Sequence, residues 1–449
     1  MRKLTKLERY NEKVLSRYNV YNTVFLTLPF KSINKTGKLL PIFSDHCANG
    51  FKNKLSPYEI VNSFFKIYCE DFSEVEMKTL LFRFIQYIER QVVLFDAIED
   101  ASFPHINNLD GIGTLRNIKE AFEKSSSKET LIKYLKKIKI KPVLTAHPTQ
   151  FYPGSVLGII TDLSYAIENN DLIEIKSLLA QLGKTPFFKK KKPTPYDEAV
   201  SLTWYLENMF YNSISNIQKY IKSNIADNKF INYDLISLGF WPGGDRDGNP
   251  YVTNEITIKT AFKLRSDIIK NYYRDVRKLR RRLTFQNVED VVIDIENRLY
   301  LSMDEELENP SISLVELKEK LLFIRKKIIK DHESLFLDQV EELIDKVNIF
   351  GYHFASLDIR QDSGIHNDVF KRILKEKFGI KMSKKYLEMN EDDKINFLSN
   401  SKFKSNINDF SDSIVLKTLG SINAMRNIQK ANGEKGCHRY IISHNESAL

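Results

Sequence analysis

The segment VLTAHPTQ, Val143–Gln150, ends a strand-like run with a histidine and a proline. A run of Val, Leu and Thr favours a strand, and Pro148 biases His147 toward an extended backbone. In α/β proteins the chemistry is concentrated at the ends of strands. A lone histidine is more often a core residue that hydrogen-bonds the backbone, so both roles remain open for His147 at this point.

Three further segments have strand character, and each of the four follows a long helical pattern. The four are KPVLTA (141–146), LISLGFW (235–241), FGYHFASLDIR (350–360) and HRYIIS (438–443). Apolar residues at three- and four-residue steps predict helices over 55–102, 115–138, 155–183, 196–226, 254–284, 289–303 and 313–348, with Ser127 and Thr253 as caps. Strands that alternate with helices indicate a parallel sheet built from crossover units. The predicted fold class is therefore α/β, predominantly helical, with large helical insertions.

The helical segment 55–102 carries an apolar stripe that we expect to be core. The members of this stripe recur at helical spacing and are Leu80, Leu81, Phe84, Ile85, Ile88 and Val92. Such a pattern is typical of helix packing rather than of cofactor binding.

Composition places the chain among globular proteins and narrows its surroundings. It has 449 residues, 42% of them hydrophobic and 28% charged, so it can bury a large core in one or more domains. The net charge of +10 favours anionic partners, and metabolites, phosphates and nucleic acids all remain open. Three cysteines without zinc spacing predict a reduced, cytoplasmic setting with no structural metal. We expect neither a membrane span nor a signal peptide, because no apolar run is long enough and the N-terminus is polar.

The second strand-like segment runs into GFWPGGDRDGNPYVT, residues 239–253, which is the least ordinary stretch of the chain. Glycines and prolines surround Asp245, Arg246, Asp247 and Asn249, so the backbone can turn sharply and bring its amides close to a ligand. The spacing fits neither a calcium-binding loop nor a P-loop. The structural alternative is an Asp/Arg network that only fixes the loop.

The third strand-like segment also ends in charged and hydroxyl side chains. In SLDIRQDSGIH these are Ser356, Asp358, Arg360, Asp362 and Ser363. Arginine offers a planar fork that matches phosphate or carboxylate oxygens, although an ion-paired structural arginine is equally compatible with this segment alone. Because parallel strands end on one face, we expect His147, the 239–253 loop and Arg360 to converge.

These three segments together resemble a known family. VLTAHPT, FWPGGDRDGNP and SLDIRQDS, in this order, are similar to motifs of phosphoenolpyruvate carboxylase, and so is PTPYDEA (193–199) between the first two. The resemblance covers essentially the whole chain but only the N-terminal half of the family. It implies a (β/α)8 barrel encased in helices, of which this chain has about four of the eight strands. We therefore expect a fragment, with an N-terminal helical region over 1–140 and the first portion of the barrel over 141–449.

The resemblance also implies a reaction and a role for each matching residue. The family carboxylates phosphoenolpyruvate with bicarbonate to oxaloacetate and phosphate, through carboxyphosphate and an enolate. His147 matches the catalytic histidine, which takes the proton from carboxyphosphate, and Arg360 matches an arginine that holds the substrate phosphate. Trp241 lines the substrate site. The loop residues around it are Gly243, Gly244, Asp245, Arg246 and Asp247.

Cofactor, assembly and location follow from the same resemblance. The family uses Mg²⁺ or Mn²⁺, whose ligands we expect in the missing C-terminal half, so no metal ligand is predicted in this chain and the fragment alone is expected to be inactive. The full-length enzyme is expected to be a cytoplasmic homotetramer that replenishes oxaloacetate, without nucleic-acid or membrane partners. Two positions depart from the family pattern: Gln150 stands where glutamate is usual, and Pro242 replaces the usual residue after Trp241.

Two other interpretations remain at this point. A half-length chain can be a non-catalytic anion-binding or regulatory module that keeps the anion site without the chemistry. A nucleic-acid interpretation rests on the net charge and on the basic helix RDVRKLRRRL, residues 274–283, whose charges wrap around several faces. The lysine run 189–192 is interpreted as a solvated loop, with an anion-contacting loop as the alternative.

Overall fold

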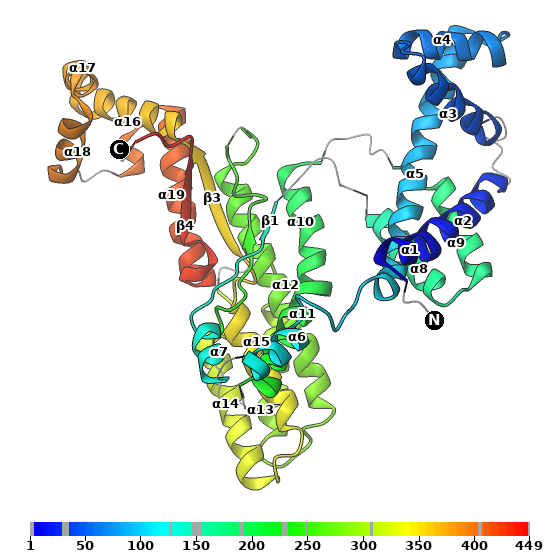
Figure 1. Cartoon of the computed structure of the whole chain (residues 1–449). Helices are drawn as coiled ribbons and strands as arrows, with labels where there is room; N and C mark the ends of the chain where they lie inside the picture. The colour runs from blue at the N-terminus through cyan, green and yellow to red at the C-terminus, as the bar shows by residue number, and fades with distance from the viewer. Residues whose placement is uncertain are drawn as a thin grey trace. The chain divides into compact units, whose positions relative to one another are not determined.

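The chain forms two compact units, each with its own hydrophobic core. The computed structural model describes residues 4–28, 36–125, 128–145, 152, 154–187, 193–226, 232–247, 249–305, 309–402 and 406–447. The first unit comprises residues 1–117 and 148–191, and the second comprises residues 118–147 and 192–449. Helices make up most of both units, and the strands lie in the second (Figure 1). None of the described helices is long and apolar enough to cross a membrane.

The first unit is helical throughout its described elements. These are α1 (Lys6–Tyr10), the π-helical turn η1 (Asn11–Leu15), α2 (Ser16–Thr27), α3 (Thr36–Lys52), α4 (Pro57–Tyr68), α5 (Glu74–Ile106), α8 (Gly154–Glu168) and α9 (Leu172–Lys184). The long helix α5 begins where the Ser73 side chain accepts a hydrogen bond from the Glu76 amide and the Glu76 carboxylate accepts one from the Ser73 amide. It packs along α8, and the core of the unit includes Phe25, Leu94 and Leu163.

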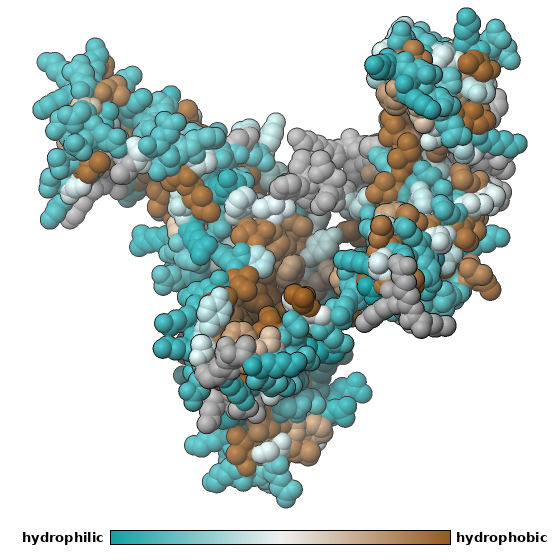
Figure 2. All heavy atoms as spheres, viewed as in Figure 1, coloured by the Kyte–Doolittle hydropathy of each residue, from teal (hydrophilic) through white to brown (hydrophobic). Residues whose placement is uncertain are grey.

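The apolar stripe on α5 is only partly core. Leu80 and Phe84 are buried, as expected, whereas Ile85, Ile88 and Val92 are 52%, 48% and 46% exposed. The prediction that the whole stripe is core is therefore wrong for these three residues. Helix α5 has apolar residues on more than one face, and its neighbours in the described part of the unit cover only one of them. Hydrophobic surface is visible along α5 in Figure 2.

The second unit surrounds its strands with further helices. They are α6 (Leu115–Ser125), α7 (Lys128–Leu135), α10 (Pro195–Tyr205), α11 (Tyr211–Asn224), α12 (Asn254–Arg280), α13 (Glu289–Leu301), α14 (Leu314–Asp331), α15 (Leu337–Phe350), α16 (Ser363–Phe378), α17 (Ile380–Glu388), α18 (Glu391–Asn400) and α19 (Ser413–Asn432). The π-helical turn η2 (Leu206–Phe210) joins α10 to α11, and η3 (Ile407–Asp409) and η4 (Glu434–Gly436) are short 3₁₀ turns.

The predicted helical segments are helical in the structure, but their predicted ends differ from the observed ones. Each predicted helical segment contains helix, but 55–102 divides into α4 and α5, and 313–348 divides into α14 and α15. The predicted cap Thr253 is confirmed, because its side chain accepts a hydrogen bond from the Ile256 amide at the start of α12. The other predicted cap, Ser127, lies outside the described residues. Helices α1 to α3 and α16 to α19 were not predicted.

The described strands form a parallel sheet whose spatial order is the chain order. They are β1 (Val143–Leu144), β2 (Gly239–Phe240), β3 (Ser356–Asp362) and β4 (Arg439–Ser443), paired in the order β1-β2-β3-β4. Figure 1 labels β1, β3 and β4. All four predicted segments contain a strand, so the α/β class with a parallel sheet is confirmed. All four strands are shorter than predicted, and the third begins late because α15 continues to Phe350 and turns follow it. A closed barrel, and the boundary at residue 140, stay predictions.

Helix α12 shares a hydrophobic core with the strands that carry the predicted site. Phe240, Leu357 and Ile359 are buried in one core with Ile268 of α12. The Tyr272 hydroxyl of the same helix donates a hydrogen bond of 2.7 Å to the Gly351 carbonyl, just before β3. Burial of apolar side chains on this scale stabilises the unit and leaves the strand ends little freedom.

Candidate functional site

The ends of β2 and β3 bring the predicted loop and Arg360 together. The Arg360 amide donates to the Gly244 carbonyl at 3.0 Å, and the Arg246 amide donates to the Arg360 carbonyl at 3.1 Å. Asp245 and Arg360 form a parallel β-bridge. The loop after Trp241 therefore continues along β3 beyond the regular pairing of β2, and the predicted convergence of these two segments is seen in the structure.

The Arg360 guanidinium lies between an aromatic ring and two carboxylates. Its central carbon is 4.0 Å from the centroid of the Trp241 ring. Its Nη1 donates to Asp245 Oδ2 at 2.6 Å, and its Nη2 lies 3.8 Å from Asp247 Oδ2. The Nε–H is buried and finds no hydrogen-bond partner among the described residues. The side chain is thus oriented by its neighbours, and its planar guanidinium has the shape that suits an anionic ligand.

Burial shapes the electrostatics of the Asp245 carboxylate. Removal from water raises the pKa of Asp245, and the positive charge of Arg360 partly opposes this shift. An ion pair in a site with little water interacts strongly and also gives up hydration. A ligand phosphate that binds Arg360 therefore competes with Asp245 for the same donors.

Two glycines allow the loop to approach α12 and β3 this closely. Gly243 has a φ of +77°, and a Cβ there would lie 2.2 Å from Thr260 Oγ1. A Cβ on Gly244 would lie 2.3 Å from the Asp358 carbonyl oxygen. The Thr257 hydroxyl donates a hydrogen bond of 2.7 Å to the Gly243 carbonyl. Only residues without a side chain fit these two positions.

Arg246 connects the same loop to two helices. Its Nη1 donates to Asn254 Oδ1 at 2.6 Å and to the Lys417 carbonyl at 3.2 Å. Burial lowers the pKa of Arg246. Its contacts in the structure fix the loop between α12 and α19, which suits the predicted role of shaping the site.

His147 lies outside the described residues, and so do Gln150, Gly248 and the lysine run 189–192. The strand before the histidine is described, and its end is beside β2. The Trp241 amide donates a hydrogen bond of 3.0 Å to the Leu144 carbonyl. Three strand ends, those of β1, β2 and β3, therefore follow one another at this edge of the sheet.

An acidic pair with a histidine, which the sequence analysis did not find, lies at the ends of β3 and β4. One ligand atom each from Asp247, Asp362 and His444 falls within 4.8 Å of the others. His444 Nδ1 is 2.8 Å from Asp362 Oδ2, and this hydrogen bond is the main reason why the pKa of Asp362 is lowered. The other oxygen of Asp362 accepts from the Gly364 amide at the start of α16, and Asp247 faces Arg360.

This group does not fit a magnesium ion. Mg²⁺ requires near-octahedral oxygen ligands, whereas one of the three donors is an imidazole nitrogen and both carboxylates already have partners. No catalytic step is therefore assigned to a metal at this place. The sequence points to Asp247 and Asp362 separately but not to His444, and the convergence expected for parallel strand ends was the signal that could have joined the three.

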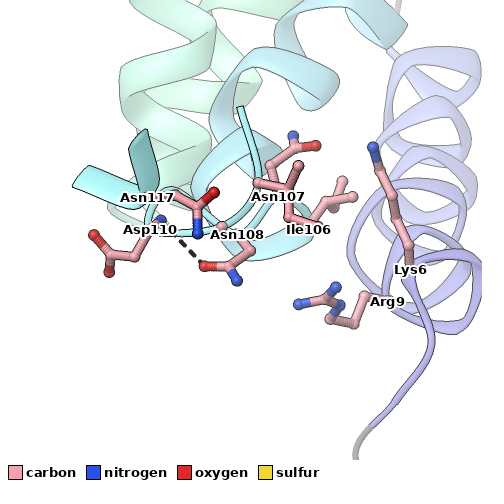
Figure 3. Close-up of a pocket in the computed structure, with 9 residues that line it drawn as sticks. Lys6, Arg9, Ile106, Asn107, Asn108, Asp110 and Asn117 are labelled. Carbon is pink, nitrogen blue, oxygen red and sulfur yellow. Dashed lines mark hydrogen bonds between the residues drawn. The ribbon is translucent and has the colours of Figure 1, made fainter. Parts of the chain in front are cut away.

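The first unit contains a polar cavity of about 570 Å³. Lys6 and Arg9 of α1 face Asn107, Asn108 and Asn117 across it (Figure 3). The cavity is open, and its lining carries neither an aromatic wall nor a histidine. The strand-end site in the second unit is the better candidate, because its arginine is stacked on a ring, paired with carboxylates and only 19% exposed.

The sequence model of the phosphoenolpyruvate carboxylase family matches residues 99–313 and 304–448 of this chain. Among curated proteins, the phosphoenolpyruvate carboxylase of Shewanella sediminis is 27% identical over 289 residues, which are 55% of this chain and 33% of the relative. That of Acinetobacter baumannii is 26% identical over 294 residues, 56% of this chain and 33% of the relative. That of Haemophilus influenzae is 27% identical over 299 residues, 56% of this chain and 34% of the relative. The match thus spans about a third of the length of these curated relatives.

Proposed function

The chain belongs to the phosphoenolpyruvate carboxylase family, and on this basis we propose that it forms the N-terminal half of an enzyme that carboxylates phosphoenolpyruvate with bicarbonate. The observation that carries the proposal is Arg360, stacked on Trp241 and paired with Asp245 at the ends of β2 and β3. A cation held in place beside an aromatic ring suits a small phosphorylated substrate with an apolar carbon.

The reaction has three steps. An oxygen of bicarbonate attacks phosphorus, and the bond from phosphorus to the enol oxygen breaks, which gives carboxyphosphate and the enolate of pyruvate. Carboxyphosphate then loses its proton and divides into carbon dioxide and phosphate. The methylene carbon of the enolate forms a bond to carbon dioxide, and the product is oxaloacetate.

Arg360 and Trp241 bind the substrate in this proposal. The guanidinium holds the phosphate with the Nη1 and Nη2 donors that now face Asp245 and Asp247. The indole covers one side of the methylene carbon and excludes water, which protects the enolate from protonation before carbon dioxide is captured. Gly243 and Gly244 keep the loop close enough to β3 for these two side chains to remain in contact.

His147 is the general base of the proposal. A neutral imidazole near pH 7 can take the proton from carboxyphosphate as this intermediate divides. The divalent metal that the family requires, Mg²⁺ or Mn²⁺, supplies positive charge to the phosphate and enolate oxygens when bound. In this proposal the metal ligands lie in the other half of the enzyme. The complete enzyme assembles as a homotetramer.

The first experiment substitutes Arg360→Ala in the complete gene product. Loss of charge-assisted hydrogen bonds to the phosphate should weaken phosphoenolpyruvate binding by roughly 10- to 100-fold. Isothermal titration calorimetry gives the dissociation constant, and a coupled malate dehydrogenase assay gives the rate of oxaloacetate formation. Arg372→Ala is the matched control, because Arg372 is bound by Asp368 and Asp412 on the surface and should change neither value.

The second experiment tests the general base and separates the enzyme from a non-catalytic anion-binding module. His147→Asn should keep phosphoenolpyruvate binding and lower the rate of oxaloacetate formation by roughly 10²- to 10⁴-fold. A variant that carboxylates at the normal rate would refute the role of His147. A wild-type gene product that binds phosphoenolpyruvate but forms no oxaloacetate with Mg²⁺ or Mn²⁺ would establish the binding module instead.

A further inference from the structure

Asp358 and Lys141 form a largely buried pair beside the Trp241 indole. The Asp358 side chain is 2% exposed, and its Oδ2 accepts a hydrogen bond of 3.2 Å from the Trp241 indole Nε1–H. The Nζ of Lys141, whose side chain is 13% exposed, is 3.5 Å from the other oxygen of Asp358. Burial lowers the pKa of Lys141, while the negative charge of Asp358 favours its protonated form. Burial of two charges is costly unless each has a partner, and here each faces the other.

Lys141 reaches Asp358 by crossing the strand that separates them. Lys141 precedes β1, Asp358 belongs to β3, and β2 lies between these strands. The crossing takes place over Gly239 of β2, where a Cβ would lie 2.9 Å from Lys141 Cε. The missing side chain at this position therefore makes room for the lysine stem, and the ion pair spans the three strands.

Asp358 and Arg360 act on the same indole from two directions. They are two residues apart on β3, so their side chains share one face of the sheet. Asp358 holds the N–H edge of the Trp241 ring, and Arg360 lies over its face at 4.0 Å from the ring centroid. An indole has a single hydrogen-bond donor, so this bond determines how the ring is turned. The orientation of the ring in turn sets the surface on which the guanidinium rests.

We propose that Asp358, held by Lys141, is a positioning residue that fixes Trp241 and, through it, the Arg360 guanidinium. Neither Asp358 nor Lys141 touches the substrate. The inference rests on the proposed function in one respect, that Arg360 binds the phosphate. Its structural part, that Asp358 and Lys141 orient Trp241, stands on the contacts alone and can be measured without substrate.

The structural part is tested with the fluorescence of Trp241. The sequence contains two tryptophans, so Trp204→Phe leaves Trp241 as the single reporter. In that background Asp358→Ala should shift the emission to longer wavelength and raise quenching by the neutral quencher acrylamide about twofold or more. Asp358→Asn keeps an oxygen that accepts from the indole and should largely restore both values. Asp362→Ala is the matched control, because its carboxylate is on the same strand and contacts His444 instead.

The functional part is tested with a double-mutant cycle in the complete gene product. Asp358→Ala should raise the dissociation constant for phosphoenolpyruvate roughly tenfold, the size expected for a lost hydrogen bond to a charged group. In a Trp241→Phe background Asp358→Ala should raise this dissociation constant less than about twofold, because the indole N–H through which Asp358 acts is already absent. An undiminished effect in that background would overturn the proposed route through Trp241.

Circular dichroism first establishes that each variant is folded. If Asp358→Ala does not fold, Lys141→Met takes its place, since it removes the charge behind Asp358 and keeps an apolar stem. Unchanged emission and quenching in a folded variant would overturn the positioning role. If Trp241 responds to these substitutions but Arg360→Ala binds phosphoenolpyruvate normally, the proposed function fails while the orientation of Trp241 by Asp358 is upheld.

Discussion

At the scale of single residues, Gly243 makes the close packing of the site possible. Gly243→Ala combines an unfavourable φ of +77° with a Cβ 2.2 Å from Thr260 Oγ1. We expect it to lower the free energy of unfolding by roughly 2–4 kcal/mol and to loosen the contact between Arg360 and Trp241. Urea denaturation measures the first effect, and Trp241 fluorescence measures the second.

The chain offers a control for the backbone part of this cost. Gly379 has a φ of +84°, and a Cβ there would have nothing within 4 Å. Gly379→Ala should therefore cost only the backbone strain, roughly 1–2 kcal/mol. Equal losses at the two positions would contradict the steric argument for Gly243.

Single residues of the site differ in how far the sequence predicts them. Arg360 and Asp358 are predictable in position, because a strand followed by a helix places charged residues at a strand end. The contact of Arg360 with Trp241 and Asp245 depends on a bridge between residues that are more than a hundred positions apart. The role of Lys141 is even harder to predict from the sequence, because it depends on the absent side chain of Gly239 on the strand beside it.

At the scale of elements, α12 carries a buried carboxylate that should make stability depend on pH. Asp267 is 1% exposed, burial raises its pKa to about 6, and Lys263 one turn earlier donates to it at 2.7 Å. Because the folded pKa exceeds the unfolded value, the unfolded chain loses this proton first. The contribution of Asp267 is therefore fully present below about pH 4 and is lost as the pH rises through 6.

The comparison with an uncharged side chain isolates this effect. Relative to wild type, Asp267→Asn should gain on the order of 1–3 kcal/mol in the free energy of unfolding between pH 4 and pH 7. Urea denaturation at the two pH values measures the gain. Asp392→Asn, at an exposed position of α18, should show little change. If wild type and Asp267→Asn differ by the same free energy of unfolding at pH 4 and at pH 7, the shifted titration of Asp267 is refuted.

The elements also show why pattern alone misplaces boundaries. The segment FGYHFA is apolar and buried, and periodicity cannot distinguish a short buried strand from the end of a buried helix. In the structure Phe350 ends α15, and β3 begins at Ser356. On α5 the pattern identifies a helix correctly, but it does not reveal which of the apolar faces finds a partner. Tertiary packing decides both questions, and single-segment patterns carry no information about it.

At the scale of the whole molecule, the two units have separate hydrophobic cores. The core of the first includes Leu94, that of the second includes Leu264, and the two clusters share no residue among those described. We expect two unfolding transitions in calorimetry. Leu94→Ala should lower the midpoint of one transition and Leu264→Ala that of the other, each by roughly 5–10 °C. A single transition that both substitutions move would contradict this prediction.

The long crossovers between neighbouring strands determine when the site can form. Arg360 meets Asp245 across 115 positions of the chain, and Trp241 meets Asp358 across 117. Helices form from local contacts, whereas contacts of such range must wait until the intervening segments have folded. During refolding the far-ultraviolet signal of the helices should therefore recover well before the fluorescence of Trp241. The proposed substrate site is in this sense formed late in folding, and its formation indicates that the second unit has reached its native arrangement.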